Sequence, residues 1–135
     1  MTRATVVMLE GRSVEQKRSI VKAISGVLSD VFEVPVTSVS SRIAETSFEN
    51  MASGGELRCD SAREGKPQYG ALLEPRIIIQ HLKEYSADQR KEATKRITDK
   101  VAEYANVSKD DVTVYFYTMP SETFAVNGVL HSDRG

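Results

Sequence analysis

The chain has 135 residues, 40% of them hydrophobic and 27% charged, a balance typical of one folded domain. Its formal charge of −1 does not indicate the positively charged surface that nucleic-acid binding requires. No apolar run approaches the ~18 residues of a membrane span. With no signal-peptide pattern at the start and a single cysteine, Cys59, we expect a cytoplasmic protein without an internal disulfide.

The first part of the chain predicts a strand, a helix and a second strand. Residues 4–9 are rich in strand formers. Ser13-x-x-Gln16 is a capping box, and the apolar residues after it fall at three- and four-residue spacing, which predicts a helix. Pro35 marks the end of the helical region, and a second strand is expected at about 38–45.

The same order of elements then returns. The stretch 60–74 has no periodicity and is interpreted as a connector. A strand follows at 77–82, a second capping box at Ser86-x-x-Gln89 begins a helix, and a strand is expected at about 112–118.

Corresponding residues of the two units are separated by a constant number of positions. Ser13 and Ser86 are 73 residues apart, and the same offset without a gap relates further pairs. These pairs are Ile24 and Ile97, Val34 and Val107, Val39 and Val112, Gly55 and Gly128, and Leu57 and Leu130. We therefore predict a single domain, 1–135, built from a β-α-β unit at 2–59, a connector at 60–74 and a second unit at 75–135.

This pattern predicts an α/β (α+β) fold. Each strand–helix–strand crossover should be right-handed and parallel, and two units can form a four-stranded sheet with both helices on one face. Six apolar strand residues are too many for one helix layer, so self-association through the other face is expected; they are Val6, Met8, Ile77, Ile79, Val114 and Phe116. A ferredoxin-like fold, whose antiparallel central pair is joined by the middle connection, is the alternative.

Three segments of the first unit carry a family resemblance: Leu9-Glu10-Gly11-Arg12-Ser13-Val14-Glu15-Gln16-Lys17, Val34-Pro35-Val36-Thr37-Ser38-Val39 and Gly54-Gly55-Glu56-Leu57. Together they resemble the 4-oxalocrotonate tautomerases, and the second unit adds Phe124-Ala125-Val126-Asn127-Gly128-Val129-Leu130. The resemblance implies the tautomerase fold and, for a fused chain, a homotrimer. It also implies a reaction without metal or cofactor.

The resemblance further implies a mechanism. An amino-terminal proline amine, neutral near pH 7 in an apolar site beside arginines, moves a proton within a small 2-oxo or enol acid. One arginine at the first strand's end and another on the second strand hold the carboxylate and the developing oxyanion, and a phenylalanine forms the apolar wall.

The first unit matches these roles only in part. Thr2 stands where the family has its proline, Arg12 matches the strand-end arginine, Ser40 stands at the second arginine position and Met51 at the phenylalanine position. Arg42, two residues after Ser40, lies on the same strand face and is a candidate replacement for the missing arginine. If Met1 is removed, the Thr2 amine is the candidate base, with a reference pKa of about 7.7–8.0.

The second unit matches differently. Pro75 stands at the proline position, Tyr85 and Thr113 at the arginine positions, and Phe124 at the phenylalanine position. Pro75 lies inside the chain, so its nitrogen is an amide without a basic lone pair, and its expected role is to begin a strand.

Other polar residues are expected to be structural. Arg3 and Arg76 are predicted to be solvated residues at strand starts. The spacing of His81, His131 and Cys59 does not match that of metal ligands. Two functions stay open: a weak or specialised isomerase that binds a small 2-oxo or enol acid through Arg12, and a non-catalytic relative that binds a small anion.

Overall fold

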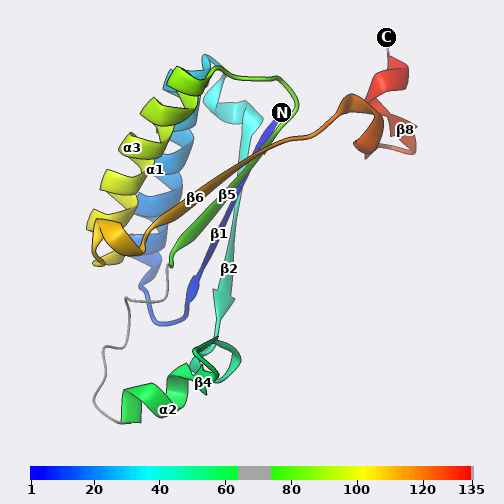
Figure 1. Cartoon of the computed structure of the whole chain (residues 1–135). Coiled ribbons are helices and arrows are strands. Elements are labelled where there is room, and N and C mark those ends of the chain that lie inside the picture. The colour runs from blue at the N-terminus through cyan, green and yellow to red at the C-terminus, as the bar shows by residue number, and fades with distance from the viewer. Residues whose placement is uncertain (64–73, 135) are drawn as a thin grey trace.

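The computed structural model describes residues 1–63 and 74–134. Four strands form one mixed sheet in the order β2-β1-β5-β6: β1 (Thr2–Leu9), β2 (Val39–Thr46), β5 (Arg76–His81) and β6 (Thr113–Thr118). Two long helices, α1 (Val14–Phe32) and α3 (Ala87–Ala105), lie side by side on one face of the sheet (Figure 1). The predicted α/β class, with a four-stranded sheet and both helices on one face, is confirmed.

Strand directions follow the two units. β1 runs parallel to β2, and β5 runs parallel to β6, as the crossovers predicted. The central pair, β1 and β5, is antiparallel. These are the first strands of the two units, so the middle connection does not join them directly, and the ferredoxin-like alternative does not apply.

Short elements extend both units beyond the sheet. After β2 come η2 (Phe48–Asn50), β3 (Ala52–Ser53), β4 (Glu56–Leu57) and α2 (Arg58–Arg63). After β6 come η4 (Ser121–Thr123), β7 (Ala125–Val126), β8 (Val129–Leu130) and η5 (His131–Arg134). Two further turns precede the second strands, η1 (Val36–Ser38) and η3 (Lys109–Asp111). The β4 and β8 hairpins lie at opposite ends of the molecule (Figure 1).

The helix α2 was not predicted. It reaches into the stretch 60–74, for which the sequence predicted a connector and no helix. A helix of six residues is too short for apolar periodicity to reveal it. Residues 64–73 of that stretch lie outside the described residues.

Both capping boxes form as predicted. Ser13 Oγ accepts from Gln16 N at 3.1 Å, and Gln16 Oε1 accepts from Ser13 N at 2.9 Å. Ser86 and Gln89 repeat the pair at 3.1 and 3.0 Å. These reciprocal bonds satisfy N–H groups that the first turn of a helix leaves without an intrahelical partner.

The repeat register appears directly in contacts between the units. Gln16 Nε2 donates to the Tyr104 carbonyl at 3.0 Å, and Gln89 Nε2 donates to the Val31 carbonyl at 3.3 Å. Adding 73 to 16 and 31 gives 89 and 104, so each helix start holds the end of the other unit's helix. The two units are therefore related by an approximate two-fold axis.

The core lies between the sheet and the helices, and it corrects the argument for a second buried face. Val6, Met8, Ile77 and Ile79 are each 0% exposed within this one layer, and Val114 and Phe116 pack against it. All six fit because alternate strand residues share a face and the register places Ile77 beside both Val6 and Val114. The opposite face instead carries polar and aromatic side chains: Arg3, Thr5, Ser40, Arg42, Gln80, Tyr115 and Tyr117.

Candidate functional site

The predicted site residues occupy two ends of β1. Thr2 begins this strand of 8 residues, and Arg12 follows its other end. At ~3.3 Å per residue, the two strand ends are separated by roughly 23 Å. The antiparallel register places Thr2 beside His81, where β5 ends, and brings Val7 beside Arg76, where β5 begins. Thr2 and Arg12 of one chain therefore do not share a site.

Arg12 lies in a buried ion pair. Its Nη1 is 3.3 Å from Oε2 of Glu74 and its Nη2 is 3.5 Å from Oε1, and the side chains are 1% and 0% exposed. The guanidinium also donates to the carbonyls of Leu9 and Ala105 at 3.2 and 3.4 Å. Arg12 thus joins the two units, and a carboxylate of the chain itself occupies its guanidinium.

Pro75 lies beside this ion pair. It is buried and precedes β5, and its carbonyl accepts from Thr113 N at 3.1 Å. Its nitrogen belongs to the peptide bond with Glu74, so it cannot accept a proton. Met51 belongs to the hairpin that follows β2, and its carbonyl accepts from Arg58 N at 2.7 Å.

Thr2 lies at the other end in an aromatic setting. It is 1% exposed, and its hydroxyl hydrogen-bonds the Tyr85 phenol. Burial raises the pKa of Tyr85, and the Thr2 hydrogen bond partly offsets this. The Tyr85 ring stacks on Phe32 with centroids 3.8 Å apart. This packing fixes the first residue of β1 against the second unit.

His81 completes the aromatic cluster. Its ring is 1% exposed and meets Tyr85 edge to face at 5.0 Å. Nδ1 lies 2.7 Å from the Lys83 carbonyl, so Nδ1 carries the proton and donates. Burial lowers the pKa of His81, against the smaller effect of this hydrogen bond. The neutral imidazole is therefore favoured.

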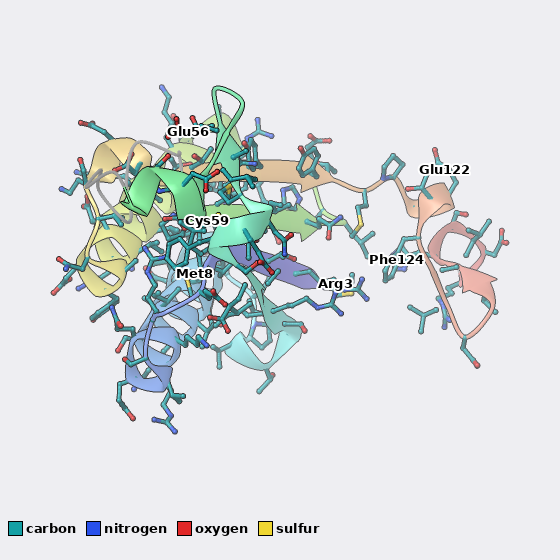
Figure 2. The ribbon with its side chains drawn as sticks, turned by 90° about the horizontal axis from the view of Figure 1, so that it is seen from below. Arg3, Met8, Glu56, Cys59, Glu122 and Phe124 are labelled. Carbon is teal, nitrogen blue, oxygen red and sulfur yellow. The ribbon has the colours of Figure 1, made fainter. Side chains whose placement is uncertain are left out.

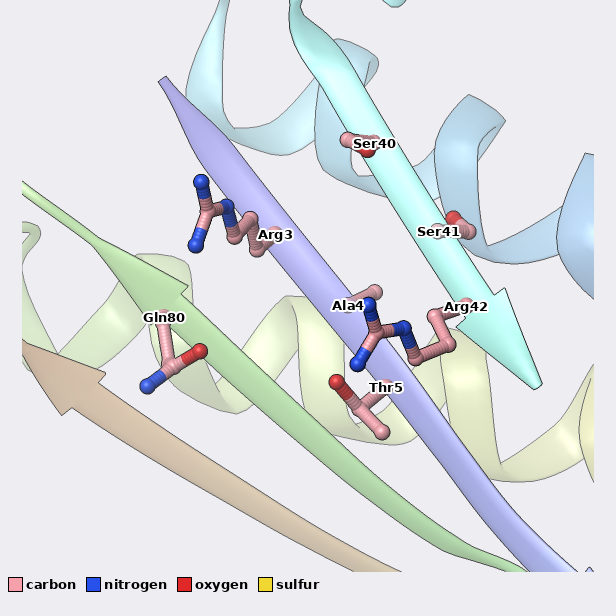
Figure 3. A pocket seen from close by; sticks show the side chains of 7 residues that line it. All are labelled: Arg3, Ala4, Thr5, Ser40, Ser41, Arg42 and Gln80. Atoms are coloured by element: carbon pink, nitrogen blue, oxygen red, sulfur yellow. The ribbon is translucent and has the colours of Figure 1, made fainter. Parts of the chain in front are cut away.

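A pocket of about 300 Å³ opens on the sheet face next to this end. Its polar lining comes from three neighbouring strands: Arg3 and Thr5 on β1, Ser40, Ser41 and Arg42 on β2, and Gln80 on β5. Figure 3 shows the Arg42 side chain reaching over β1 above Thr5, while the Arg3 guanidinium stands further along the same strand. Each of these guanidiniums can bind a carboxylate through two parallel N–H groups.

The C-terminal arm also approaches this pocket. The Arg3 guanidinium carbon lies 5.6 Å from the centre of the Phe124 ring, within the range of a cation–π contact. Figure 2 shows the two side chains pointing toward one another. The structure thus brings together Ser40, Arg42 and Phe124 with Arg3 near the start of β1, and leaves Arg12 and Met51 at the other end.

Two of these residues were not predicted as site residues. Arg3 was expected to be only a solvated residue at a strand start, although its place on the same strand face as Thr5 was a usable signal. Glu74 carried no local signal, because its partner Arg12 is 62 residues away in sequence. Within residues 1–63 and 74–134, no three His, Cys, Asp or Glu side chains gather as metal ligands. No helix in these ranges is long and apolar enough to cross a membrane.

Comparisons with known proteins give the family. A family model described as "Tautomerase enzyme" matches residues 4–59 and again 75–134. The chain is 39% identical over 54 residues to 2-hydroxymuconate tautomerase from Pseudomonas putida, which covers 40% of this chain and 86% of that protein.

Solved structures agree on the fold. A wild-type fused 4-OT, an asymmetric trimer, matches with a TM-score of 0.80 at 20% identity over 98% of each chain. A native fused 4-OT also reaches 0.80, at 17% identity over 98% of each chain. A member of the cis-3-chloroacrylic acid dehalogenase family reaches 0.70 at 18% identity, over 95% of this chain and 82% of that one. The chain belongs to the tautomerase family and consists of two fused copies of its β-α-β unit.

Proposed function

We propose that this protein is a weak or specialised keto–enol isomerase that binds a small 2-oxo or enol carboxylic acid in the pocket lined by Arg3 and Arg42. The presence of two guanidiniums in the lining of one open pocket carries this proposal. Among the described residues, neither arginine takes part in an ion pair, so both can meet a carboxylate of the substrate. Ser40 and Gln80 offer hydrogen bonds beside them.

The Thr2 amine, exposed by removal of Met1, serves as the base. Thr2 directly precedes Arg3, and its side chain is anchored by Tyr85. The amine takes a proton from one atom of the substrate and returns it at another, while a guanidinium stabilises the developing oxyanion. Cations near an amine favour its neutral form, which is the form that accepts a proton. Phe124 lies over Arg3 and supplies an apolar wall.

The test is the ketonisation of phenylenolpyruvate, followed spectroscopically. Two preparations are compared, one whose N-terminal mass shows Thr2 first and one in which Met1 is retained. We expect ketonisation above the buffer rate for the first and at least a tenfold lower kcat/KM for the second. A ketonisation rate equal to the rate in buffer alone, for both preparations, would rule out the isomerase proposal.

A second function has its own support. At the other end of the sheet, Pro75 offers only an amide and Arg12 is already paired with Glu74, so neither of these two residues offers a base or an open cation. A chain that has lost these groups at one end is also consistent with a non-catalytic protein that binds a small anion between Arg3 and Arg42. Calorimetry that shows saturable binding of pyruvate without turnover would favour this function.

We also propose how the chain works as an assembly. The two repeats, 2–59 and 75–135, act as one domain joined by 60–74, in a cytoplasmic setting, with no metal or cofactor needed for the proposed proton transfer. The exposed rings of Tyr115 and Tyr117 on the uncovered sheet face support a homotrimer. Light scattering would then give three times the chain mass of 14.9 kDa.

A further inference from the structure

Three N–H groups converge on the carboxylate of Glu74 where β1 ends. The backbone N–H of Leu9 donates to Oε2 at 2.9 Å. The Arg12 guanidinium donates from Nη1 to Oε2 at 3.3 Å and from Nη2 to Oε1 at 3.5 Å. Glu74 is 0% exposed, so these donors hold a carboxylate that water does not reach.

The donors are positioned independently of Glu74. The Arg12 guanidinium also donates to the Leu9 carbonyl at 3.2 Å and to the Ala105 carbonyl at 3.4 Å. The Leu9 N–H is fixed by the backbone of β1. Truncation of the Glu74 side chain would therefore leave the three donors in place around the space that the carboxylate had filled. Loss of one partner of a buried ion pair is strongly destabilising, and a carboxylate of matching size could restore the lost contacts.

The other end of the sheet has no such arrangement. The 73-residue offset places Tyr85 where Arg12 would be and Met1 where Glu74 would be. Neither side chain is charged, and Tyr85 instead stacks on Phe32. The guanidinium–carboxylate pair is therefore not a requirement of the repeated fold but a feature of one end.

We propose that Arg12 and the Leu9 N–H form a carboxylate-binding site that the chain fills with its own Glu74. The site takes small monocarboxylates of the size of acetate once the Glu74 carboxylate is removed. In the intact protein the Glu74 carboxylate occupies these donors, so the site is closed to carboxylates from solution. The assignment does not depend on what that pocket binds.

The test is chemical rescue of Glu74→Ala, in which acetate replaces the deleted CH2–COO⁻ group. Thermal unfolding is followed by circular dichroism in sodium acetate and in sodium chloride of equal ionic strength. In chloride, we expect the variant to unfold roughly 10 °C below the wild type, as loss of one partner of a buried ion pair implies. Acetate should raise the variant's Tm saturably by at least about 5 °C more than it raises that of the wild type.

Three variants separate this site from other effects of acetate. The double variant Arg12→Met/Glu74→Ala should lose the rescue, and Glu74→Gln, whose amide still fills the space, should show none. The rescue should persist in an Arg3→Ala/Arg42→Ala background, which keeps this proposal distinct from the proposed function. If Glu74→Ala is unfolded in chloride, acetate should fold it. An equal acetate effect in the wild type, a rescue that survives Arg12→Met, or a variant that stays unfolded in acetate would overturn the proposal.

Discussion

The guanidinium of Arg3, on the first strand, lies 5.6 Å from the centre of the Phe124 ring, which comes from the C-terminal arm. Arg3 also lines the pocket on the sheet face, together with Arg42 and Ser40. The arm therefore contributes to the same end of the molecule as the amino terminus. Under the proposed function, the ring shields the substrate's apolar part while the arginines hold its carboxylate.

Phe124→Ala should raise the KM for phenylenolpyruvate about 3- to 10-fold, the size expected for a lost apolar contact worth about 1 kcal/mol. The folded state should be little affected, because Phe124 is only half-buried. Steady-state kinetics checks this, with Val126→Ala as the control because Val126 is 50% exposed on the same arm. Equal KM values for the wild type and Phe124→Ala would show that the ring does not meet the substrate.

Arg12→Met should lower the free energy of unfolding by about 3–5 kcal/mol, because it leaves the carboxylate of Glu74 buried without its cation. The matched control is Lys17→Met, which breaks the partly exposed pair with Glu45 and should cost less than about 1 kcal/mol. Urea denaturation measures both. If the two variants were equally stable, the buried pair would not join the two units as described.

Replacement of His81 should change how stability depends on pH. Burial lowers the pKa of His81 in the folded state. Below about pH 6.5, the ordinary histidine pKa, the unfolded chain therefore binds a proton at His81 that the folded chain does not yet bind. The wild type should therefore lose stability as the pH falls from 7 through 6.5 toward the lowered pKa of the folded state. His81→Phe, whose ring can stay among Phe32 and Tyr85, should lack this loss.

The measurement is urea denaturation of both proteins at pH 7.5, 6.5 and 5.5. We expect the wild type to lose stability relative to His81→Phe only in the two more acidic buffers. His131→Phe, at an exposed position, controls for removing a histidine. Parallel pH profiles for the wild type and His81→Phe would contradict the assigned role of burial.

Pro75→Ala should leave kcat/KM for ketonisation within about twofold of the wild type. Pro75 carries an amide nitrogen and lies beside the Arg12–Glu74 pair, at the opposite end of β1 from the pocket. Its loss removes no basic group. A drop of tenfold or more, in a variant whose circular dichroism matches the wild type, would show that the reaction takes place at the Pro75 end of the sheet and not in the Arg3–Arg42 pocket.

Local features of the fold were predictable, because their partners are close in sequence. Ser13 and Gln16 are three residues apart, and together they correctly predicted where α1 begins. The offset of 73 residues likewise predicted the second unit and, with it, the pairing of two helices on one sheet. Helix α2 was missed because its six residues are too few to show a period.

The site was less predictable, because it depends on which ends of the strands meet. Each unit alone could not show that β1 and β5 are antiparallel, and this register brings the end of β1 beside the start of β5. The same register places Arg12 against Glu74, a contact without a local signal. The predicted face of Arg42, by contrast, followed from strand alternation alone, and it lines the same pocket as Ser40.

The most direct test of the proposed function is kcat/KM for phenylenolpyruvate ketonisation by Arg3→Ala/Arg42→Ala, in protein whose first residue is Thr2. Arg18→Ala, which removes an exposed guanidinium from α1, is the control for lost positive charge. We expect a reduction of at least a hundredfold for the double variant and less than twofold for Arg18→Ala. A double variant as active as the wild type would contradict the assignment of this pocket as the substrate site.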